Sequence, residues 1–348
     1  MIIDLRSDTV TKPTEAMLAA MMQAKVGDDV FDEDPSVKQL ERKVADYFGM
    51  EAGLFCPSGT MTNQIALRIS TQPQDEIICD VRSHIYNYEA GGIAYNSLVS
   101  VSLANGHYGR LSADDITGCI RPDDVHAPNT SLVCLENTVN KGGGSYYEME
   151  NIKEIHAVAK AHNLNLHLDG ARLFNALVAS GQDAKAYGKY FDTISICLSK
   201  GLGAPVGSVL LSDKEGIKRA NRVRKVFGGG MRQAGYLAAA GIYALDHHVD
   251  RLSEDHRRAR ILGEVLVQQS FVKEVLPVAT NIVIFSLATG LTPQWLLEEL
   301  LKYQIKAVPF GKEEVRFVTH LDFDDHMLTK TRQALEEISE VVMKSDKI

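Results

Sequence analysis

Short apolar runs alternate with longer amphipathic stretches through the first two thirds of the chain, and this alternation limits the fold more than any other feature. Seven runs have the length and composition of buried strands: 53–56, 76–79, 98–102, 131–135, 164–168, 193–198 and 207–211. Four stretches between them have the apolar spacing of helices: 37–48, 60–70, 149–162 and 172–180. Fully apolar strands separated by helices are typical of a mostly parallel sheet with helices on both faces. The sequence therefore predicts an α/β domain.

Beyond about residue 245 the pattern changes. A charged helix is predicted over 247–269, followed by a strand at 282–286, a helix at 293–302, a strand ending near Val308, a strand at 314–319 and a helix at 327–343. Elements on this scale indicate a small α+β domain appended to the first. We therefore expect a large domain over residues 1–248, including an N-terminal arm, and a small C-terminal domain over 249–348.

The composition argues against several classes of protein. The 348 residues carry a formal net charge of −8 without a basic stripe, so nucleic acid is not the expected partner. No apolar run approaches the roughly 18 residues of a membrane span, and the first ten residues carry charges rather than an apolar signal core. The cysteines form no CxxC pair and the histidines no HExxH motif, so we expect reduced core thiols and no catalytic metal. These features favour a cytoplasmic protein that acts on a small molecule.

A lone lysine ends one of the predicted core strands. In SICLSKGLGAPVGSVLL, Lys200 follows an apolar run and precedes a turn that contains Gly201 and Gly203. Lysine is among the residues least often fully buried, so it either extends its ammonium group to solvent or performs chemistry. A strand-end amine can form a Schiff base with an aldehyde, and the glycines let the backbone turn beside a bound molecule.

Three further segments follow predicted strands, at the edge where open α/β sheets bind ligands. Gly59 and Thr60 open a helix whose amino end can bind a phosphate, although taken alone an ordinary helix cap is the better explanation. Asp169 and Arg172 can hold a positive ring nitrogen and an anion, or can simply pair with each other. A lone histidine such as His84 usually has a structural role, but its position at the same edge favours a functional one.

Together these residues match the chemical groups of pyridoxal 5′-phosphate. That cofactor needs a cup for its phosphate, a carboxylate for its pyridine nitrogen, an aromatic ring against its face and a lysine for its aldehyde. A dinucleotide-binding fold is the main alternative for a glycine-rich turn. It fits poorly, because Val206 stands in place of the third glycine of GxGxxG and Pro205 disfavours the helix that should follow.

At these residues the chain resembles the L-threonine aldolase family of fold-type-I pyridoxal phosphate enzymes. The resemblance extends over nearly the whole chain, through DLRSDTVTKPTEAM, VGDDVFDEDPSVKQLE, PSGTMTNQIAL, SHIYNYEAGG, LENTVN, LHLDGARLFNA, SICLSKGLGAPVGS, GGGMRQAG and VRFVTHLD. It implies the aspartate aminotransferase type of fold. One departure is Asp32, which stands where the family usually has glycine; because aspartate tolerates a left-handed backbone, we expect only a local loop change.

The resemblance also implies roles for individual residues. It places Lys200 on the cofactor aldehyde, Asp169 at the pyridine nitrogen and His84 against the ring. The implied cofactor contacts are Lys200, Gly59, Thr60, His84, Asp169, Arg172 and Arg232. The implied substrate contacts are Ser7, Arg172, Arg316 and His126. Because the GGGMRQ segment with Arg232 resembles one near a neighbouring subunit's cofactor, a homodimer or homotetramer with shared active sites is expected.

The implied reaction cleaves the Cα–Cβ bond of L-threonine or L-allo-threonine, which breaks down threonine and forms glycine and acetaldehyde; related substrates would give other aldehydes. The expected base for the β-hydroxyl proton is His126, or a water that it positions, with His84 as the second candidate. An aminotransferase would share Lys200 and Asp169 but would move the Cα proton and need a keto acid. A cofactor-binding regulator or scaffold is a third interpretation, with little support because the lysine, the aspartate and both histidines are present.

Overall fold

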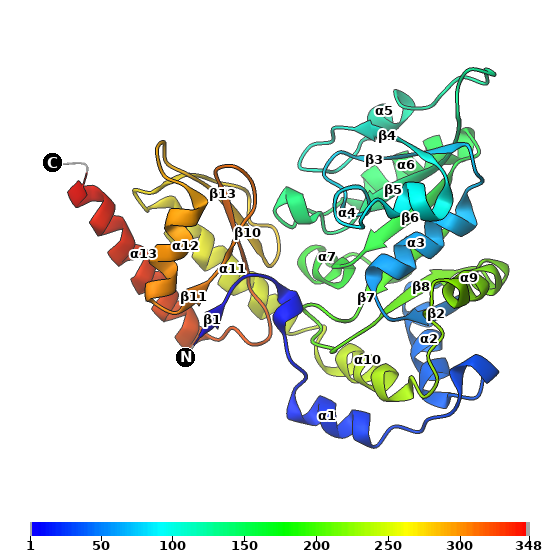
Figure 1. Ribbon diagram of the computed structural model, residues 1–348, viewed down its shortest axis with the longest axis horizontal. Helices are drawn as coiled ribbons and strands as arrows, with labels where there is room; N and C mark the ends of the chain where they lie inside the picture. The colour runs from blue at the N-terminus through cyan, green and yellow to red at the C-terminus, as the bar shows by residue number, and fades with distance from the viewer. Residues whose placement is uncertain (1, 346–348) are drawn as a thin grey trace.

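The fold comes from a computed structural model, which describes residues 2–345. Its centre is a seven-stranded sheet in the order β2-β8-β7-β6-β5-β3-β4 (Figure 1). The strands are β2 (Ala52–Cys56), β3 (Asp75–Asp80), β4 (Ser100–Ala104), β5 (Asn129–Glu136), β6 (Asn165–Gly170), β7 (Thr193–Cys197) and β8 (Ser208–Ser212). Strand β8 runs antiparallel to both neighbours, and every other adjacent pair is parallel. The seven predicted strands and the mostly parallel sheet are confirmed.

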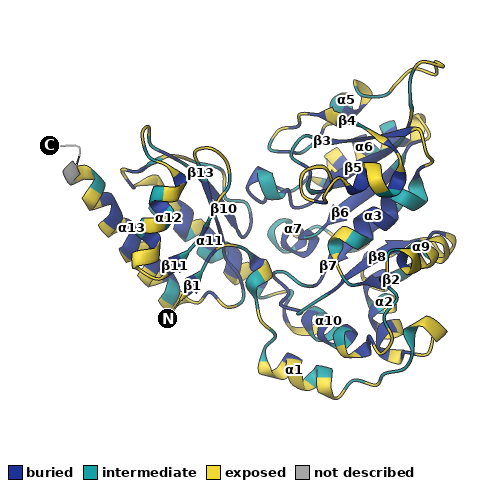
Figure 2. Cartoon of the chain, viewed as in Figure 1, coloured by how far each residue is buried: buried dark blue, intermediate teal, exposed yellow. Residues whose placement is uncertain are grey.

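Helices cover both faces of this sheet, because neighbouring residues of a strand point to opposite sides. One face carries Phe55 and Val133 and packs against α2 (Pro35–Phe48), α6 (Met149–Ala161), α7 (Leu173–Ser180) and α10 (Gly235–His247). The other face carries Leu54 and Leu132 and is covered by α3 (Gly59–Ser70) and α9 (Lys214–Val226). Helix α1 (Glu15–Met22) packs on α10 at the outside of the domain. The inner strands are accordingly buried and the edge strand β4 is partly exposed, whereas α1 and α9 each expose one side (Figure 2).

Helix α2 illustrates why these segments form helices. The carboxylate of Asp34 accepts hydrogen bonds from the backbone N–H groups of Ser36 and Val37, and Pro35 occupies the first turn. Apolar residues then recur at helical spacing and are fully buried: Val37, Leu40, Val44 and Phe48. The helix ends at Gly49, whose φ of 67° is the left-handed conformation that favours glycine.

The described residues from Leu252 onward form a second, smaller α+β unit, which corresponds to the predicted small domain. Its sheet is antiparallel and has the order β12-β13-β10-β9. Its elements are α11 (Leu252–Val267), β9 (Val272–Val275), β10 (Ile282–Leu287), α12 (Pro293–Lys302), β11 (Ile305–Lys306), β12 (Val308–Pro309), β13 (Glu314–Val318) and α13 (Asp325–Ser345). Strand β1 (Ile3–Asp4) pairs with β11, so Ile3 and Leu5 belong to the core of this domain (Figure 1).

The structure differs from the predicted elements at the junction of the two domains. The helix predicted over 247–269 is present as α11, but it begins at Leu252, because α10 ends at His247 and a turn separates the two helices. In the turn between them, Nδ1 of His248 lies 2.7 Å from the carbonyl oxygen of Leu202, a distant contact that the local pattern does not reveal. The predicted domain boundary at residue 248 stays a prediction, although β1 lies before that boundary and joins the small domain.

Two smaller expectations concern the backbone and the membrane. Asp32 has a φ of 60°, the left-handed conformation for which aspartate was expected to be tolerated in place of glycine. Among residues 2–345, no helix combines the length and the apolar character needed to cross a membrane.

Candidate active site

A pocket of about 330 Å³ lies where the parallel strands end and the small domain meets the large one. Four of its residues follow four different strands: His84 follows β3, Asn140 follows β5, Arg172 follows β6 and Lys200 follows β7. The remaining lining residues are Ser7, Thr9, Tyr88, Val308, Pro309, Phe310 and Arg316. The structure thus brings together five of the residues predicted from the sequence: Ser7, His84, Arg172, Lys200 and Arg316.

The backbone around Lys200 is held from two sides. Its carbonyl oxygen accepts hydrogen bonds from Thr11 Oγ1 at 3.1 Å and from the N–H of Gly203 at 2.8 Å. Gly203 has a φ of 78°, which a glycine adopts without strain. The Nζ of Lys200 forms no hydrogen bond or ion pair with any other residue of the described chain. A fixed backbone therefore presents an unpaired amine to the pocket.

His84 and Asp169 belong to one hydrogen-bond network. Nδ1 of His84 lies 3.0 Å from Oε1 of the buried Glu89, and Asn63 Nδ2 donates to both Glu89 Oε1 and Asp169 Oδ2, each at 2.9 Å. The second oxygen of Asp169 accepts from the N–H of Ala171. Burial lowers the pKa of His84, but the hydrogen bond to Glu89 and the nearby carboxylates outweigh it, so this pKa lies above its ordinary value.

Glu136 is a further buried carboxyl beside His84. Its two oxygens accept hydrogen bonds from the backbone N–H groups of His84 and Asn140, both at 2.8 Å. Burial, followed by the negative charge of Asp169, raises the pKa of Glu136 to about 7, although those two N–H groups oppose the shift. Sequence reasoning missed Glu136, Glu89, Asn63 and Asn140, even though they lie in the motifs LENTVN, SHIYNYEAGG and PSGTMTNQIAL.

The two arginines form the positive side of the pocket. Arg172 donates from Nε and Nη2 to the two oxygens of Asp8 at 2.8 and 2.7 Å, and Asn281 Nδ2 also donates to Asp8. Burial alone would raise the pKa of Asp8, but Arg172 outweighs it and holds this pKa well below the usual range. The local Asp169–Arg172 ion pair weighed from the sequence does not form, because Arg172 turns to Asp8 instead.

Arg316 reaches the pocket from the small domain. Its Nη1 donates to Asn140 Oδ1 at 2.8 Å, its Nη2 donates to the carbonyl oxygen of Arg6 at 2.9 Å, and its guanidinium lies 4.6 Å from the centre of the Phe310 ring. Burial lowers the pKa of Arg316 to about 10, and the positive charge of Arg172 adds to that effect. Two positive charges that line the same pocket indicate a site for an anion such as a carboxylate.

The predicted phosphate cup lies at the start of α3. Ser58 caps this helix by accepting a hydrogen bond from the N–H of Met61 at 3.2 Å, so the simpler capping explanation holds for Ser58. A Cβ on Gly59 would collide with Cys197 Sγ at the end of β7, so the glycine lets the helix start approach that strand closely. Thr60 is exposed in the first turn. Neither Gly59 nor Thr60 lines the pocket around Lys200, so their contact with a phosphate at this positive helix end stays a prediction.

Comparison with known proteins identifies the family. The family model described as "Beta-eliminating lyase" matches residues 4–289. The low specificity L-threonine aldolase of Escherichia coli (strain K12) is 44% identical over 333 residues, covering 94% of this chain and 97% of that protein. The chain belongs to the low-specificity L-threonine aldolase family. A probable low-specificity L-threonine aldolase of Arabidopsis thaliana is 42% identical and covers 93% of each chain.

Solved structures agree with this threonine aldolase assignment at the level of the fold. A Leishmania major threonine aldolase superposes with a TM-score of 0.84 at 21% identity, covering 97% of this chain and 99% of that one. A serine palmitoyltransferase of Sphingomonas wittichii has a TM-score of 0.77 at 16% identity. The predicted family and the predicted fold type are therefore both confirmed.

His126 is not part of this pocket of the aldolase fold. Its side chain is 90% exposed, and its Nδ1 lies 2.8 Å from Asp124 Oδ1 in the loop that precedes β5. That loop is at the amino end of β5, whereas the pocket lies at the carboxyl ends of the parallel strands. His126 therefore does not line the pocket of its own chain, and its expected place near the substrate hydroxyl stays a prediction.

Arg232 is also outside the pocket of its own chain. It is half-exposed, pairs with Asp28 at 3.0 Å and lies over the ring of Phe31 at 5.8 Å. Its predicted phosphate contact was assigned to a neighbouring subunit, so it stays a prediction.

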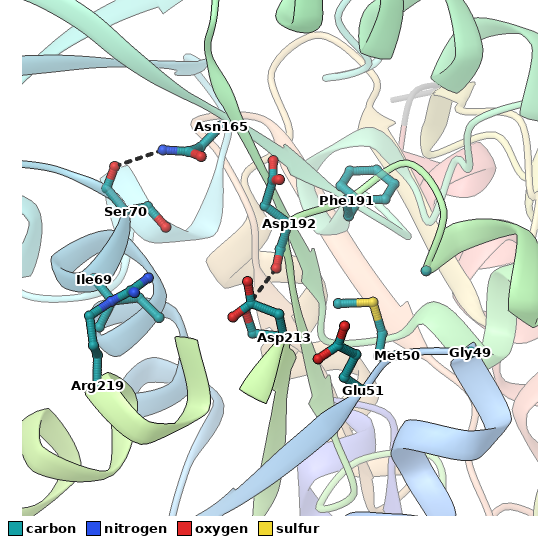
Figure 3. A pocket seen from close by; sticks show the side chains of 12 residues that line it. Gly49, Met50, Glu51, Ile69, Ser70, Asn165, Phe191, Asp192, Asp213 and Arg219 are labelled. Carbon is teal, nitrogen blue, oxygen red and sulfur yellow. Dashed lines mark hydrogen bonds between the residues drawn. The ribbon is translucent and has the colours of Figure 1, made fainter. Parts of the chain in front are cut away.

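A second pocket of about 380 Å³ lies at the opposite edge of the sheet, where β6 begins and β8 ends (Figure 3). Its polar groups bind one another: Asn165 donates to the carbonyl oxygen of Ser70 at 3.1 Å, and Ser212 donates to that of Asp192 at 3.0 Å. None of the predicted site residues lines it. The predicted site residues therefore point to the pocket around Lys200 and not to this one.

The expectation of no catalytic metal stays a prediction. His84, Glu89 and Asp169 offer atoms within 4.8 Å of one another, a spacing that a metal ion would accept. Both carboxylates, however, already accept hydrogen bonds from Asn63, and Gln64 donates to Glu89 at 2.6 Å. A cation would have to displace these donors, so hydrogen bonding explains the grouping.

Proposed function

We propose that this chain catalyses the retro-aldol cleavage of L-threonine and L-allo-threonine to glycine and acetaldehyde, using pyridoxal phosphate. The observation that carries the proposal is the amine of Lys200, which is unpaired among residues 2–345 and shares a pocket with Arg172 and Arg316. The relatives that match most of the chain are named low-specificity L-threonine aldolases, which supports this reaction class.

The residues present fit pyridoxal phosphate. Lys200 would bind its aldehyde, the buried Asp169 would meet its pyridine nitrogen and His84 would lie against its ring. The N–H groups of Gly59 and Thr60 at the start of α3 would hold the phosphate, whereas that of Met61 already donates to Ser58. When bound, pyridoxal phosphate supplies the electron sink for the pair released from the Cα–Cβ bond. Asp169 would keep a proton on the pyridine nitrogen.

The arginines would orient the substrate. Arg172 keeps Nη1 available, because its Nε and Nη2 bind Asp8. The Nε of Arg316 is buried and has no partner among residues 2–345, so it is a second donor for a carboxylate. Holding the carboxylate between them decides which bond at Cα is aligned for cleavage. Ser7 lines the same pocket and would add a hydroxyl contact.

His84 becomes the first candidate for the base, because it lines the pocket and His126 does not. Its ring would accept the β-hydroxyl proton as the Cα–Cβ bond breaks and the aldehyde leaves. His126 and Arg232 could contribute only from a second copy of the chain. Both have exposed side chains, which accords with a homodimer or homotetramer with shared sites. The cytoplasmic location and a role in cellular glycine supply remain predictions.

The test is a spectrum of the purified protein with pyridoxal phosphate, followed by addition of L-allo-threonine, with glycine and acetaldehyde measured separately. We expect a visible absorption band that shifts on substrate addition, and both products in equal amounts. A band without acetaldehyde, but with turnover that depends on a keto acid, would favour an aminotransferase. A band without any turnover would favour the cofactor-binding regulator, and Lys200→Ala should abolish the band.

A further inference from the structure

We propose that Glu89 is a positioning residue that keeps the proton of the neutral His84 ring on Nδ1, leaving Nε2 to accept the β-hydroxyl proton of the substrate. This inference rests on the proposed function in one respect: it takes His84 as the base. Its structural part, the control of the His84 ring by Glu89, does not depend on the reaction.

Among residues 2–345, the hydrogen-bond partners of the Glu89 side chain are two amide NH₂ groups and the His84 ring. Its side chain is fully buried, and its Oε1 lies 2.9 Å from Asn63 Nδ2 and 3.0 Å from His84 Nδ1. Its Oε2 accepts from Gln64 Nε2 at 2.6 Å. A carboxylate surrounded in this way acts as an acceptor, so the His84 nitrogen that faces it must carry the hydrogen.

The two amide groups cannot turn around to reverse this arrangement. Oδ1 of Asn63 lies 3.2 Å from His167 Nε2, and the other nitrogen of His167 lies 2.8 Å from the hydroxyl of Thr193. The Asn63 NH₂ group donates to two carboxylates, Glu89 and Asp169, and an inverted amide would place Oδ1 against both of them. Its Oδ1 therefore faces His167, whose Nε2 acts as the donor. In the same way, Oε1 of Gln64 accepts from Asn96 Nδ2 at 3.0 Å, which turns its NH₂ group toward Glu89.

The charged groups around His84 influence its pKa. The carboxyl groups of Glu89, Asp169 and Glu136 favour the charged ring, whereas burial opposes it. The positive groups of Lys200, Arg172 and Arg316 line the same pocket, and the Tyr88 ring lies 5.6 Å from the His84 ring. Among the three carboxyl groups, only Glu89 makes a side-chain hydrogen bond to the imidazole in the described chain. Removing its charge should therefore lower the pKa of His84.

The kinetic test is Glu89→Gln in the holoenzyme. A base must be neutral, so the acid limb of the kcat profile follows the pKa of His84. We expect this limb to move to lower pH and kcat to fall about 10²-fold. The KM for L-allo-threonine should change little, since the arginines hold the carboxylate. The matched control is Glu76→Gln, which removes a buried carboxylate that pairs with Arg121 away from the pocket. A lower kcat with an unmoved acid limb would reduce Glu89 to a structural role and overturn the proposal.

The second measurement needs no activity. Ring-nitrogen NMR of the cofactor-free protein, labelled with ¹⁵N-histidine and assigned with His84→Gln, reports which nitrogen carries the proton. We expect neutral His84 to be protonated on Nδ1 in the unmodified protein and to shift toward Nε2 in Glu89→Gln. A proton on Nε2 in the unmodified protein overturns the proposal even if Glu89→Gln does not fold. If the unmodified holoenzyme releases no acetaldehyde, the proposed function fails. The NMR spectrum still shows whether Glu89 determines which nitrogen of His84 carries the proton.

Discussion

Asp8 is the buried ion-pair partner of Arg172. Replacing Asp8 should show how much the pocket depends on this ion pair. In Asp8→Asn, Arg172 would remain buried without a negative partner, which typically costs about 3–5 kcal/mol. We expect that loss in denaturant unfolding, together with a raised KM for threonine. Glu150→Gln, which removes an exposed ion pair with Lys153, is the control and should change stability little. Equal losses in the two variants would contradict this account.

The same ion pair predicts a pH dependence of stability. The folded-state pKa of Asp8 lies below its ordinary value, so its contribution is complete above the unfolded-state pKa of roughly 3.9 and is lost as pH falls toward the folded-state value. We expect the free energy of unfolding to fall less steeply with acid in Asp8→Asn than in the unmodified protein. Unfolding curves at neutral and acid pH measure this difference, and identical slopes would show that Asp8 is not the group responsible.

Gly59 tests the predicted phosphate cup. In Gly59→Ala the new methyl group would collide with Cys197, which must shift the start of α3. We expect the affinity for pyridoxal phosphate to fall about tenfold, measured by absorbance titration of the cofactor-free protein, which corresponds to about 1.4 kcal/mol. Gly118→Ala is the control, since its φ is −65° and a Cβ there would meet its nearest neighbour at 3.5 Å. Unchanged affinity in Gly59→Ala would place the phosphate elsewhere.

At the scale of elements, Asp34 joins two helices. Besides capping α2, its carboxylate accepts from the N–H of Gly27 at 3.2 Å and from that of Gly235, at the start of α10, at 2.9 Å. Asp34→Ala would leave several buried donors unpaired, so we expect a loss of about 2 kcal/mol or more in thermal or denaturant unfolding. Asp213→Ala, which removes the exposed cap of α9, should cost about 1 kcal/mol or less. A smaller loss in Asp34→Ala than in Asp213→Ala would contradict the bridging role.

The sequence predicts the central strands and their helices well, because local apolar spacing determines them. It does not reveal β1, whose two residues form a strand only by pairing with β11. The same holds for the break after His247, where His248 contacts the distant Leu202.

Within the site, residues that directly follow strands, such as Lys200, could be predicted from position. Glu89 could not, since its importance comes from hydrogen bonds to α3. His126 precedes β5, so it lies at the amino end of that strand, and its expected role stays a prediction.

At the scale of the molecule, the site exists only where the two domains meet. Arg316 comes from the small domain and bonds to Asn140 of the large one. In Arg316→Lys the charge remains but the planar fork is lost. We expect the KM for L-allo-threonine to rise about tenfold or more, with a smaller change in kcat, in steady-state kinetics. Lys306→Arg, at a half-buried position of β11, is a control for substitution in the small domain. An unchanged KM in Arg316→Lys would remove Arg316 from the carboxylate site.

The segment around Ile3 and Leu5 has a consequence for how the protein is made on the ribosome. Its backbone hydrogen-bond partners are Gln304, Lys306 and Val318. About 300 residues must therefore be synthesised before this strand can pair. Because N-terminal domains fold first during translation, the large domain can assemble before Arg316 exists as part of the nascent chain. The pair of Arg172 and Arg316, which is proposed to hold the substrate carboxylate, can therefore form only after β13 has been synthesised.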